Sequence, residues 1–170
     1  EEDTVRQAHR LLQAQFPGAL LLWAPRHPER FKLVTTHCRS IGLRTSTRSE
    51  NKTPEGSTQC FVLDSMGELL NFFAASDVAF VGGSLCDIGG HNMLEPAGLG
   101  VPVIVGPHTY NFEEIADRMI GDGAAIRVTN GAELGGALCK ILKYSATRNA
   151  MGEAGLRVVV SERGALERLL

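Results

Sequence analysis

The sequence has little of what marks several common protein classes. It holds four cysteines, none of them in a C-x-x-C pair: Cys38, Cys60, Cys86 and Cys139. That scatter supports neither a zinc site nor a disulfide framework, and it favours reduced thiols inside a cell. No apolar run approaches the roughly 18–20 residues of a membrane-spanning helix, and no signal peptide is recognisable. The formal net charge of -2 leaves no basic excess to neutralise a nucleic-acid backbone, so nucleic acid is not an expected partner.

Two glycine signatures of nucleotide-binding enzymes are also missing. The chain contains neither the dinucleotide fingerprint G-x-G-x-x-G nor the Walker pattern. A typical dehydrogenase and a P-loop ATPase are therefore disfavoured. Metal-ligand spacing is missing as well, because His91, in the most glycine-rich loop, has no second ligand at useful spacing. We expect neither a metal nor a cofactor.

What the 170 residues do show is an alternation of short apolar runs with amphipathic segments. The length suits one domain over residues 1–170. Strands are predicted over residues 19–23, 43–48 (of edge type), 59–63, 78–81, 101–105 and 124–128, with helical segments between them. After the last strand, the final two helices of the chain are predicted over residues 145–155 and 161–170. This alternation predicts an α/β fold, a Rossmann-like doubly wound parallel sheet of about six strands, in the order 3-2-1-4-5-6.

The most informative stretch is Val81–Phe112, where a buried strand leads into a glycine-rich loop. The groups Gly82-Gly83-Ser84 and Gly89-Gly90 can adopt backbone conformations that let a ligand approach closely. A helix predicted to begin near Asn92 would direct free N–H groups and its positive dipole end at that loop, which suits an anion. One turn into this helix, Glu95 could accept hydrogen bonds from the hydroxyls of a sugar or a ribose.

Two further segments follow strands that we expect to end at the same edge of the sheet. Arg26 comes after the first strand and could bind a phosphate with two hydrogen bonds, or it could pair with Glu29 on the surface. The segment Met66-Gly67-Glu68 opens a predicted helix. It serves either as plain capping, with Asp64 or Ser65 as N-cap, or as a contact in which Gly67 lets the helix terminus touch a phosphate.

Other polar residues near these loops have alternative roles. His27 either bonds a ligand or completes a turn beside a proline, and His91 is either structural or a ligand contact. Asn92 can be N-cap and ligand contact at once. His108 and Asn111, in the next loop, could orient a sugar or shape an interdomain cleft.

Taken in order, these segments resemble one family. The run GGS…GGHN-x-LEP…G-x-PV-x-x-GPHT-x-NF is similar to the C-terminal domain of bacterial 3-deoxy-D-manno-octulosonic acid (Kdo) transferases. The resemblance extends to Ala24–Arg30 (APRHPER) and Asp64–Leu69 (DSMGEL), so that it covers most of the chain between Leu20 and Val128. It implies a GT-B glycosyltransferase, which has two Rossmann-like domains, and it implies that this chain is the donor-binding one.

The same resemblance implies ligands and site residues. The donor would be CMP-Kdo, and the acceptor a lipid A precursor bound through an N-terminal domain that we expect to be absent here. The catalytic base and the membrane contact belong to that domain, so no catalytic residue is expected in this one. The residues implied to hold CMP are Pro25, Arg26, Met66, Gly67, Glu68, Asn92, Met93, Leu94 and Glu95, with His27, Gly83, Ser84, Gly90, His91, His108 and Asn111 as further possible contacts.

We therefore expect an excised, soluble domain that binds nucleotide weakly and has no transferase activity by itself. The full-length protein would act in lipopolysaccharide biosynthesis at the cytoplasmic face of the bacterial inner membrane. Two alternatives stay open. One is another GT-B enzyme, such as a UDP-sugar transferase or epimerase, and the other is a non-catalytic nucleotide-binding domain that keeps the Rossmann shell.

Overall fold

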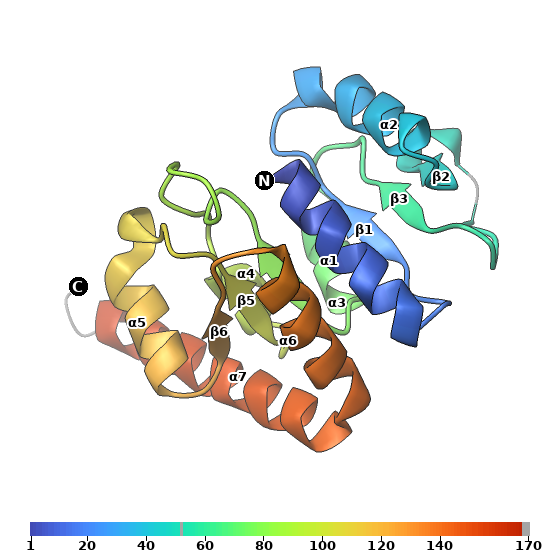
Figure 1. Cartoon of the computed structure of the whole chain (residues 1–170). Coiled ribbons are helices and arrows are strands. Elements are labelled where there is room, and N and C mark those ends of the chain that lie inside the picture. The colour runs from blue at the N-terminus through green and yellow to red at the C-terminus, as the bar shows by residue number, and fades with distance from the viewer. Residues whose placement is uncertain (52, 168–170) are drawn as a thin grey trace. The chain divides into compact units, whose positions relative to one another are not determined.

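The computed structural model describes residues 1–51 and 53–167, which form two compact units (Figure 1). The larger unit combines Glu1–Leu12 with the chain from Phe73 onward, and the smaller unit is Gln13–Phe72. Each unit contains a three-stranded parallel sheet. The predicted α/β class and the six parallel strands are confirmed, with the strands arranged as two sheets of three.

In the smaller unit the strand order is β1-β3-β2, made of β1 (Leu21–Trp23), β2 (Thr45–Thr47) and β3 (Cys60–Val62). β3 pairs with both neighbours, since Cys60 is in register with both Leu21 and Thr45. The predicted order 3-2-1 is wrong here, because it puts the second strand in the centre. The burial of the strands agrees with this outcome: β3 is apolar and wholly buried, whereas β2 is Thr-Ser-Thr and forms an edge, as the sequence predicted.

Helix α2 (Phe31–Ser40) packs on one face of the sheet of the smaller unit. A 3-10 turn, η1 (Pro28–Arg30), leads into it, because proline fits the first turn of a helix. The core between α2 and the sheet consists of Val34, Cys38, Cys60 and Val62, with Leu21, Trp23 and Leu43 packed against it.

The loops around β2 and β3 carry two shorter elements. The polar loop after β2 begins with a 3-10 turn, η2 (Arg48–Glu50), in which Thr47 and Glu50 form a capping box. The helix after β3 is α3 (Leu69–Ala74), which begins two to three residues later than the sequence predicted. Its residues fall on both sides of the division between the units.

The sheet of the larger unit has the predicted order, β4-β5-β6, and consists of β4 (Ala79–Val81), β5 (Val103–Val105) and β6 (Ala125–Arg127). Its central strand serves two cores, because successive side chains of a strand point to opposite faces. Val103 and Val105 belong to one core, and Ile104 belongs to the other. This unit is therefore doubly wound, as predicted.

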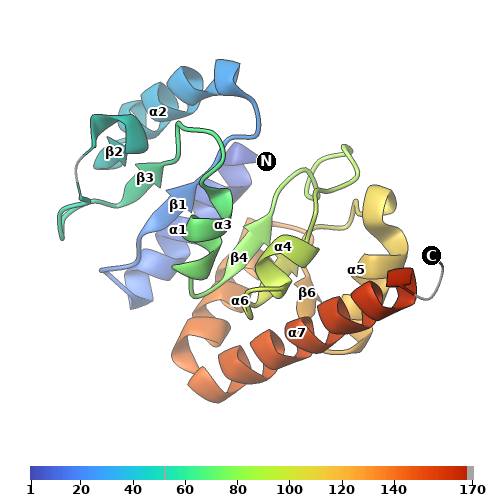
Figure 2. The same ribbon diagram turned by 180° about the vertical axis from the view of Figure 1, so that it is seen from behind.

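Helices cover both faces of that sheet. One core takes residues from α4 (Leu94–Ala97), α5 (Glu113–Gly121) and α7 (Ser145–Glu167), and Figure 2 shows these helices on one side of the sheet. The opposite core takes residues from α1 (Glu2–Gln15) and α6 (Gly131–Lys143). A last 3-10 turn, η3 (Tyr110–Phe112), leads into α5.

Helix α7 is one continuous helix, where the sequence predicted a helix ending at Gly155 and another over 161–170. Glycines in this helix mark close packing. A Cβ at Gly152 would lie 2.2 Å from Gly100 O, and one at Gly155 would lie 3.3 Å from Ala97. Glycine at these two positions lets α7 approach α4 and the turn after it. The glycines therefore serve packing, and the helix continues past Gly155. Residues 168–170 lie outside the described part of the chain.

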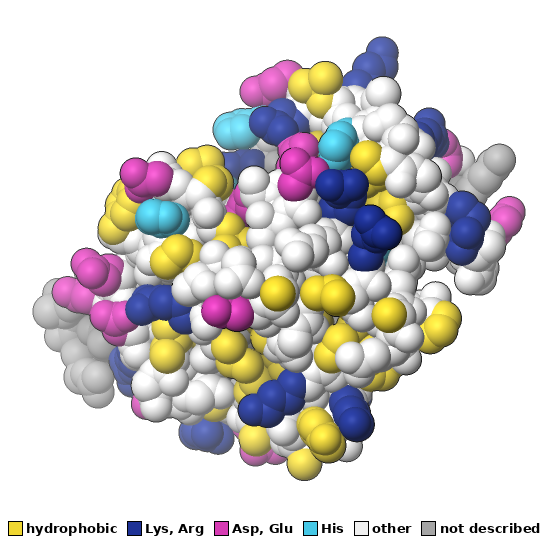
Figure 3. Space-filling model, in the orientation of Figure 1, with side chains coloured by type: hydrophobic (Ala, Val, Ile, Leu, Met, Phe, Trp, Pro, Cys, Tyr) yellow, Lys and Arg dark blue, Asp and Glu magenta, His cyan; other side chains and the backbone are white. Residues whose placement is uncertain are grey.

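The surface is mixed in charge. On the face shown in Figure 3, acidic and basic side chains are interspersed, and acidic ones gather over α5, whose first turn contains Glu113 and Glu114. Within residues 1–51 and 53–167, none of the helices combines the length and the apolarity needed to cross a membrane.

Candidate functional site

The glycine-rich loop after β4 has a shape that requires glycine at its start. Gly83 has a φ of 71°, in the left-handed region, and a Cβ there would come within 3.1 Å of the His91 ring. Gly89 and Gly90 also have positive φ values, 96° and 77°. The Gly90 N–H donates to Gly83 O at 2.8 Å. The two glycine pairs therefore fold back on each other, with His91 packed against Gly83.

Ser84 is completely buried and ties this loop to the loop after β5. Its hydroxyl donates to Val81 O and accepts from Gly106 N–H at 2.8 Å. Its carbonyl accepts from His108 N–H at 2.9 Å. The Ser84 side chain is thus engaged within the protein, and it supports the loop from inside.

The motif Asn92–Glu95 leads into α4, which begins at Leu94, two residues after Asn92 and so near it, as predicted. Asn92 Oδ1 accepts from Leu94 N–H at 3.0 Å, and Asn92 Nδ2 donates to Glu95 Oε1 at 3.1 Å. These contacts bear on the predicted anion site at this helix terminus, which stays a prediction. Four residues add up to little dipole, and the amide of Leu94 is already taken by Asn92.

The members of this motif differ in what they can offer to a ligand. Asn92 is exposed and Glu95 half-buried, so both present polar groups to solvent. Met93 is fully buried in the core, and it could reach a ligand only through its backbone. The polar face of the motif is therefore the Asn92–Glu95 pair.

The loop after β5 brings His108 and Asn111 to the glycine-rich loop. Asn111 Nδ2 donates to Ile88 O at 3.0 Å, and Asn111 N–H donates to Gly89 O at 3.1 Å. His108 Nδ1 lies 3.8 Å from a carboxylate oxygen of Asp87. The two loops meet because β4 and β5 are neighbours in a parallel sheet, and their carboxyl ends share one edge.

In the smaller unit the predicted residues also follow two neighbouring strands. Pro25–His27 come after β1 and Met66–Glu68 after β3, and these two strands pair directly. Arg26, His27 and Met66 are exposed. Gly67 has a φ of 83°, so it forms a left-handed turn before α3. The prediction that Gly67 lies within the start of the helix is therefore wrong.

The Glu68 carboxylate is held by its own unit. Ser65 donates to one oxygen, and Arg48 donates to the other through Nε at 3.1 Å and Nη2 at 3.0 Å. The Ser65 hydrogen bond, together with Arg48, holds the pKa of Glu68 below its usual value. Both oxygens of Glu68 therefore serve to fix the turn around Gly67.

Asp64, one of two predicted N-caps for α3, has a different partner. Its carboxylate accepts from the Ser49 N–H at 2.8 Å and from the Ser49 hydroxyl. Burial alone would raise the pKa of Asp64, but the hydrogen bonds from Ser49 outweigh burial, and the pKa is lowered. Asp64 thus joins the loop after β3 to η2.

Sequence reasoning missed two residues that shape these loops. Arg48 is 20 positions before its partner Glu68, and Glu1 is 82 positions before Gly83, whose N–H it accepts. No local pattern joins such distant positions. Only the residue types hinted at a role, since Glu1 is acidic and Arg48 lies at the end of a predicted strand. Charged residues at such positions are equally compatible with exposure to solvent and no specific partner.

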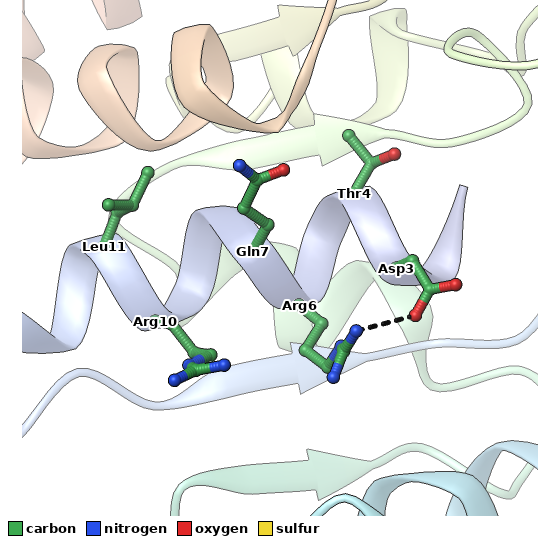
Figure 4. Close-up of a pocket in the computed structure, with 6 residues that line it drawn as sticks. All are labelled: Asp3, Thr4, Arg6, Gln7, Arg10 and Leu11. Carbon is green, nitrogen blue, oxygen red and sulfur yellow. Dashed lines mark ion pairs between the residues drawn. The ribbon is translucent and has the colours of Figure 1, made fainter.

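Another polar feature of the larger unit is a hollow of about 570 Å³ along α1 (Figure 4). Figure 4 shows Arg6 and Arg10 on one side of the helix, and Arg6 pairs with Asp3 at 3.1 Å. None of its lining residues was singled out by the sequence: they are Asp3, Thr4, Arg6, Gln7, Arg10 and Leu11. Among the described residues, no group of three or more His, Cys, Asp or Glu is placed to hold a metal ion.

Comparison with known proteins identifies the family of this chain. The chain is 42% identical over its whole length to a 3-deoxy-D-manno-octulosonic acid transferase of Haemophilus influenzae. It is 34% identical to the C-terminal CMP-Kdo binding domain of WaaA from Acinetobacter baumannii. The TM-score with that crystal structure is 0.87, over 93% of this chain and 82% of the other. The chain belongs to the Kdo transferase family.

The chain spans 40% of the length of the Haemophilus relative. It also matches the glycosyltransferase WaaG with a TM-score of 0.59 at 17% identity, over 91% of this chain and 37% of WaaG. A likeness at that identity shows the fold alone, and it agrees with the predicted half of a GT-B glycosyltransferase. No protein-family profile matches the chain. The family resemblance inferred from the three sequence blocks is confirmed.

Proposed function

We propose that this chain is the donor-binding domain of a Kdo transferase and holds CMP-Kdo for the transfer of Kdo to a lipid A precursor. The observation that carries the proposal is the match to a CMP-Kdo binding domain, at 34% identity and a TM-score of 0.87. That match covers 82% of a domain defined by this ligand, so it speaks for the donor rather than for the acceptor.

In the larger unit, the ribose is assigned to the polar pair at the start of α4. Glu95 accepts one hydrogen bond from Asn92, at 3.1 Å, through a single oxygen. A carboxylate can accept several further hydrogen bonds, and the vicinal hydroxyls of a ribose are suitable donors. Asn92 fixes the orientation of Glu95 and remains exposed on the same face. Leu94 and Met93 lie between these two residues in the motif, and Met93, which is fully buried, could contact a ligand only through its backbone.

In the smaller unit, taken by itself, Arg26 is proposed as a phosphate ligand. Its guanidinium is exposed after β1, next to Pro25 and His27, and can form two parallel hydrogen bonds with a phosphate. The turn Met66–Glu68 leaves the neighbouring strand and offers backbone groups around Gly67. Arg48 and Ser65 keep that turn in one conformation through Glu68.

The chemistry asked of this domain is modest. Breaking the glycosidic bond releases CMP, and its phosphate gains negative charge. A guanidinium bound to that phosphate would stabilise the charge as it develops in the transition state. Deprotonation of the acceptor hydroxyl is assigned to a group outside this chain. We therefore expect no turnover by these residues alone, and we place the complete enzyme at the cytoplasmic face of the inner membrane.

The test is calorimetric titration of the chain with CMP, UMP and UDP, repeated for Glu95→Ala. Loss of the ribose contact should weaken CMP binding about ten-fold, which is about 1.4 kcal/mol. The matched control is Glu114→Ala, because Glu114 is another glutamate in the first turn of a helix, and it is exposed on α5. That control should change the affinity less than about two-fold.

The possible outcomes separate the alternatives. Saturable CMP binding that weakens in Glu95→Ala, and not in Glu114→Ala, supports the proposal. A preference for UMP or UDP would favour another GT-B enzyme. Equal CMP affinity of all three proteins would remove Glu95 from the site, and binding of none of the nucleotides would contradict a donor site in this chain.

A further inference from the structure

The carboxylate of Glu1 is bound by three consecutive backbone amides of the glycine-rich loop. Its Oε2 accepts from Gly83 N–H at 2.8 Å. Its Oε1 accepts from Ser84 N–H at 3.2 Å and from Leu85 N–H at 3.0 Å. Successive N–H groups that converge in this way form a nest, a backbone concavity that binds anions. Here the anion is supplied by the chain itself.

The nest depends on the conformation of Gly83. Its left-handed φ of 71° turns the N–H groups that flank it toward one point. Three convergent donors repel one another unless an acceptor neutralises them, and hydrogen bonds to an ionised group are the stronger kind. Glu1 meets that need from 82 positions away, next to the start of α1.

The nest is joined to every loop of the candidate site in the larger unit. The carbonyl of Gly83 accepts from Gly90 N–H at 2.8 Å, just before His91 and Asn92. The carbonyl of Ser84 accepts from His108 N–H at 2.9 Å. A change in the loop at Gly83 would therefore pass in one direction toward Asn92 and Glu95 and in the other toward the loop after β5.

We propose that Glu1 is a positioning residue for the donor site: its carboxylate holds the Gly83–Leu85 amides and thereby fixes the loop that carries Asn92 and Glu95. The proposal rests on the proposed function for its link to CMP. On this proposal, the amides of Gly83 and Ser84 bind the Glu1 carboxylate and are therefore not the binding site of the donor phosphate.

The direction in which CMP affinity changes when the Glu1 charge is removed separates a positioning role from a purely electrostatic one. CMP is an anion, so removing a negative charge from the protein should tighten its binding if only the field matters. If Glu1 positions the loop, Glu1→Gln should weaken CMP binding. The matched control is Asp3→Asn, which removes one negative charge from the first turn of α1. Asp3 pairs with Arg6 instead of the loop.

The experiment measures CMP affinity by calorimetry and amide hydrogen exchange by NMR for wild type, Glu1→Gln, Glu1→Asp and Asp3→Asn. In Glu1→Gln, exchange at Gly83, Ser84 and Leu85 should accelerate about ten-fold or more, with the amides of β5 unchanged. CMP affinity should fall about five-fold, or about 1 kcal/mol. Glu1→Asp should recover part of both, and Asp3→Asn should change neither.

Three results would overturn the proposal. Unchanged exchange at Gly83–Leu85 in Glu1→Gln would show that the nest does not need Glu1. Faster exchange with unchanged or tighter CMP binding would show that Glu1 does not position the site. Accelerated exchange throughout the larger unit would reduce Glu1 to a stability role. If wild type binds no CMP, the proposed function fails, and the exchange data still decide whether Glu1 holds the loop.

Discussion

Replacing Ser84 with alanine tests whether the tie between the loops after β4 and β5 stabilises this fold. The Ser84 hydroxyl is fully buried, and it links Val81 O to Gly106 N–H. Alanine fits the same space but can make neither bond. Gly106 is buried too, so its N–H would lose this acceptor where water has little access.

The expected size follows from the burial of these groups. Leaving a buried donor unsatisfied costs about 1–3 kcal/mol, so we expect Ser84→Ala to lower the free energy of unfolding by about 2 kcal/mol. Ser40→Ala is the matched control, because the Ser40 hydroxyl also donates to a carbonyl, His37 O, at 2.8 Å but is exposed. Water can replace that bond, so the control should lose less than about 0.5 kcal/mol.

The assay is urea denaturation followed by circular dichroism, with the midpoint and the slope fitted separately. An unchanged slope with a lower midpoint for Ser84→Ala means that stability has changed rather than the surface exposed on unfolding. If Ser84→Ala and Ser40→Ala differed by less than about 0.5 kcal/mol, the reasoning from burial would be wrong.

Three further predictions address the loops and the thiols. Gly106→Ala places a Cβ 2.1 Å from Ser84 O and should cost about 2 kcal/mol, whereas Gly136→Ala in α6 meets nothing and should gain about 0.5–1 kcal/mol. Equal changes in the free energy of unfolding for the two variants, measured by urea denaturation, would contradict this prediction. The pKa of Glu68 lies below its usual 4.5 in the folded protein, so its stabilisation is present above pH 4.5 and lost as the pH falls further. The stability difference between wild type and Glu68→Gln should therefore shrink on acidification, and a constant difference would refute the pKa argument. Burial raises the pKa of Cys86 and of Cys139, and contact with Cys38 together with burial raises that of Cys60. Since only Cys86 is partly exposed, a thiol reagent should label it first in the folded chain. Labelling of Cys38 or Cys60 at the same rate would show that their core opens.

The sequence by itself determined the elements and the family. Strand and helix periodicity placed the six strands, because short apolar runs between polar segments leave few other structures. Three motif blocks identified the Kdo transferase family, because their glycines, Asn92 and Glu95 form a pattern that can be read along the chain without knowledge of the fold. Even the edge position of β2 could be predicted from its Thr-Ser-Thr composition.

Only the tertiary structure decided which strand is central and what the polar groups bind. β3 takes the centre because both of its faces are buried, and that depends on packing with the other elements. Gly155 suggested a helix end, yet it serves close packing of α7 on α4. The partners of Glu68 and of the Gly83–Leu85 amides come from Arg48 and Glu1, and folding alone brings such distant residues within hydrogen-bond range.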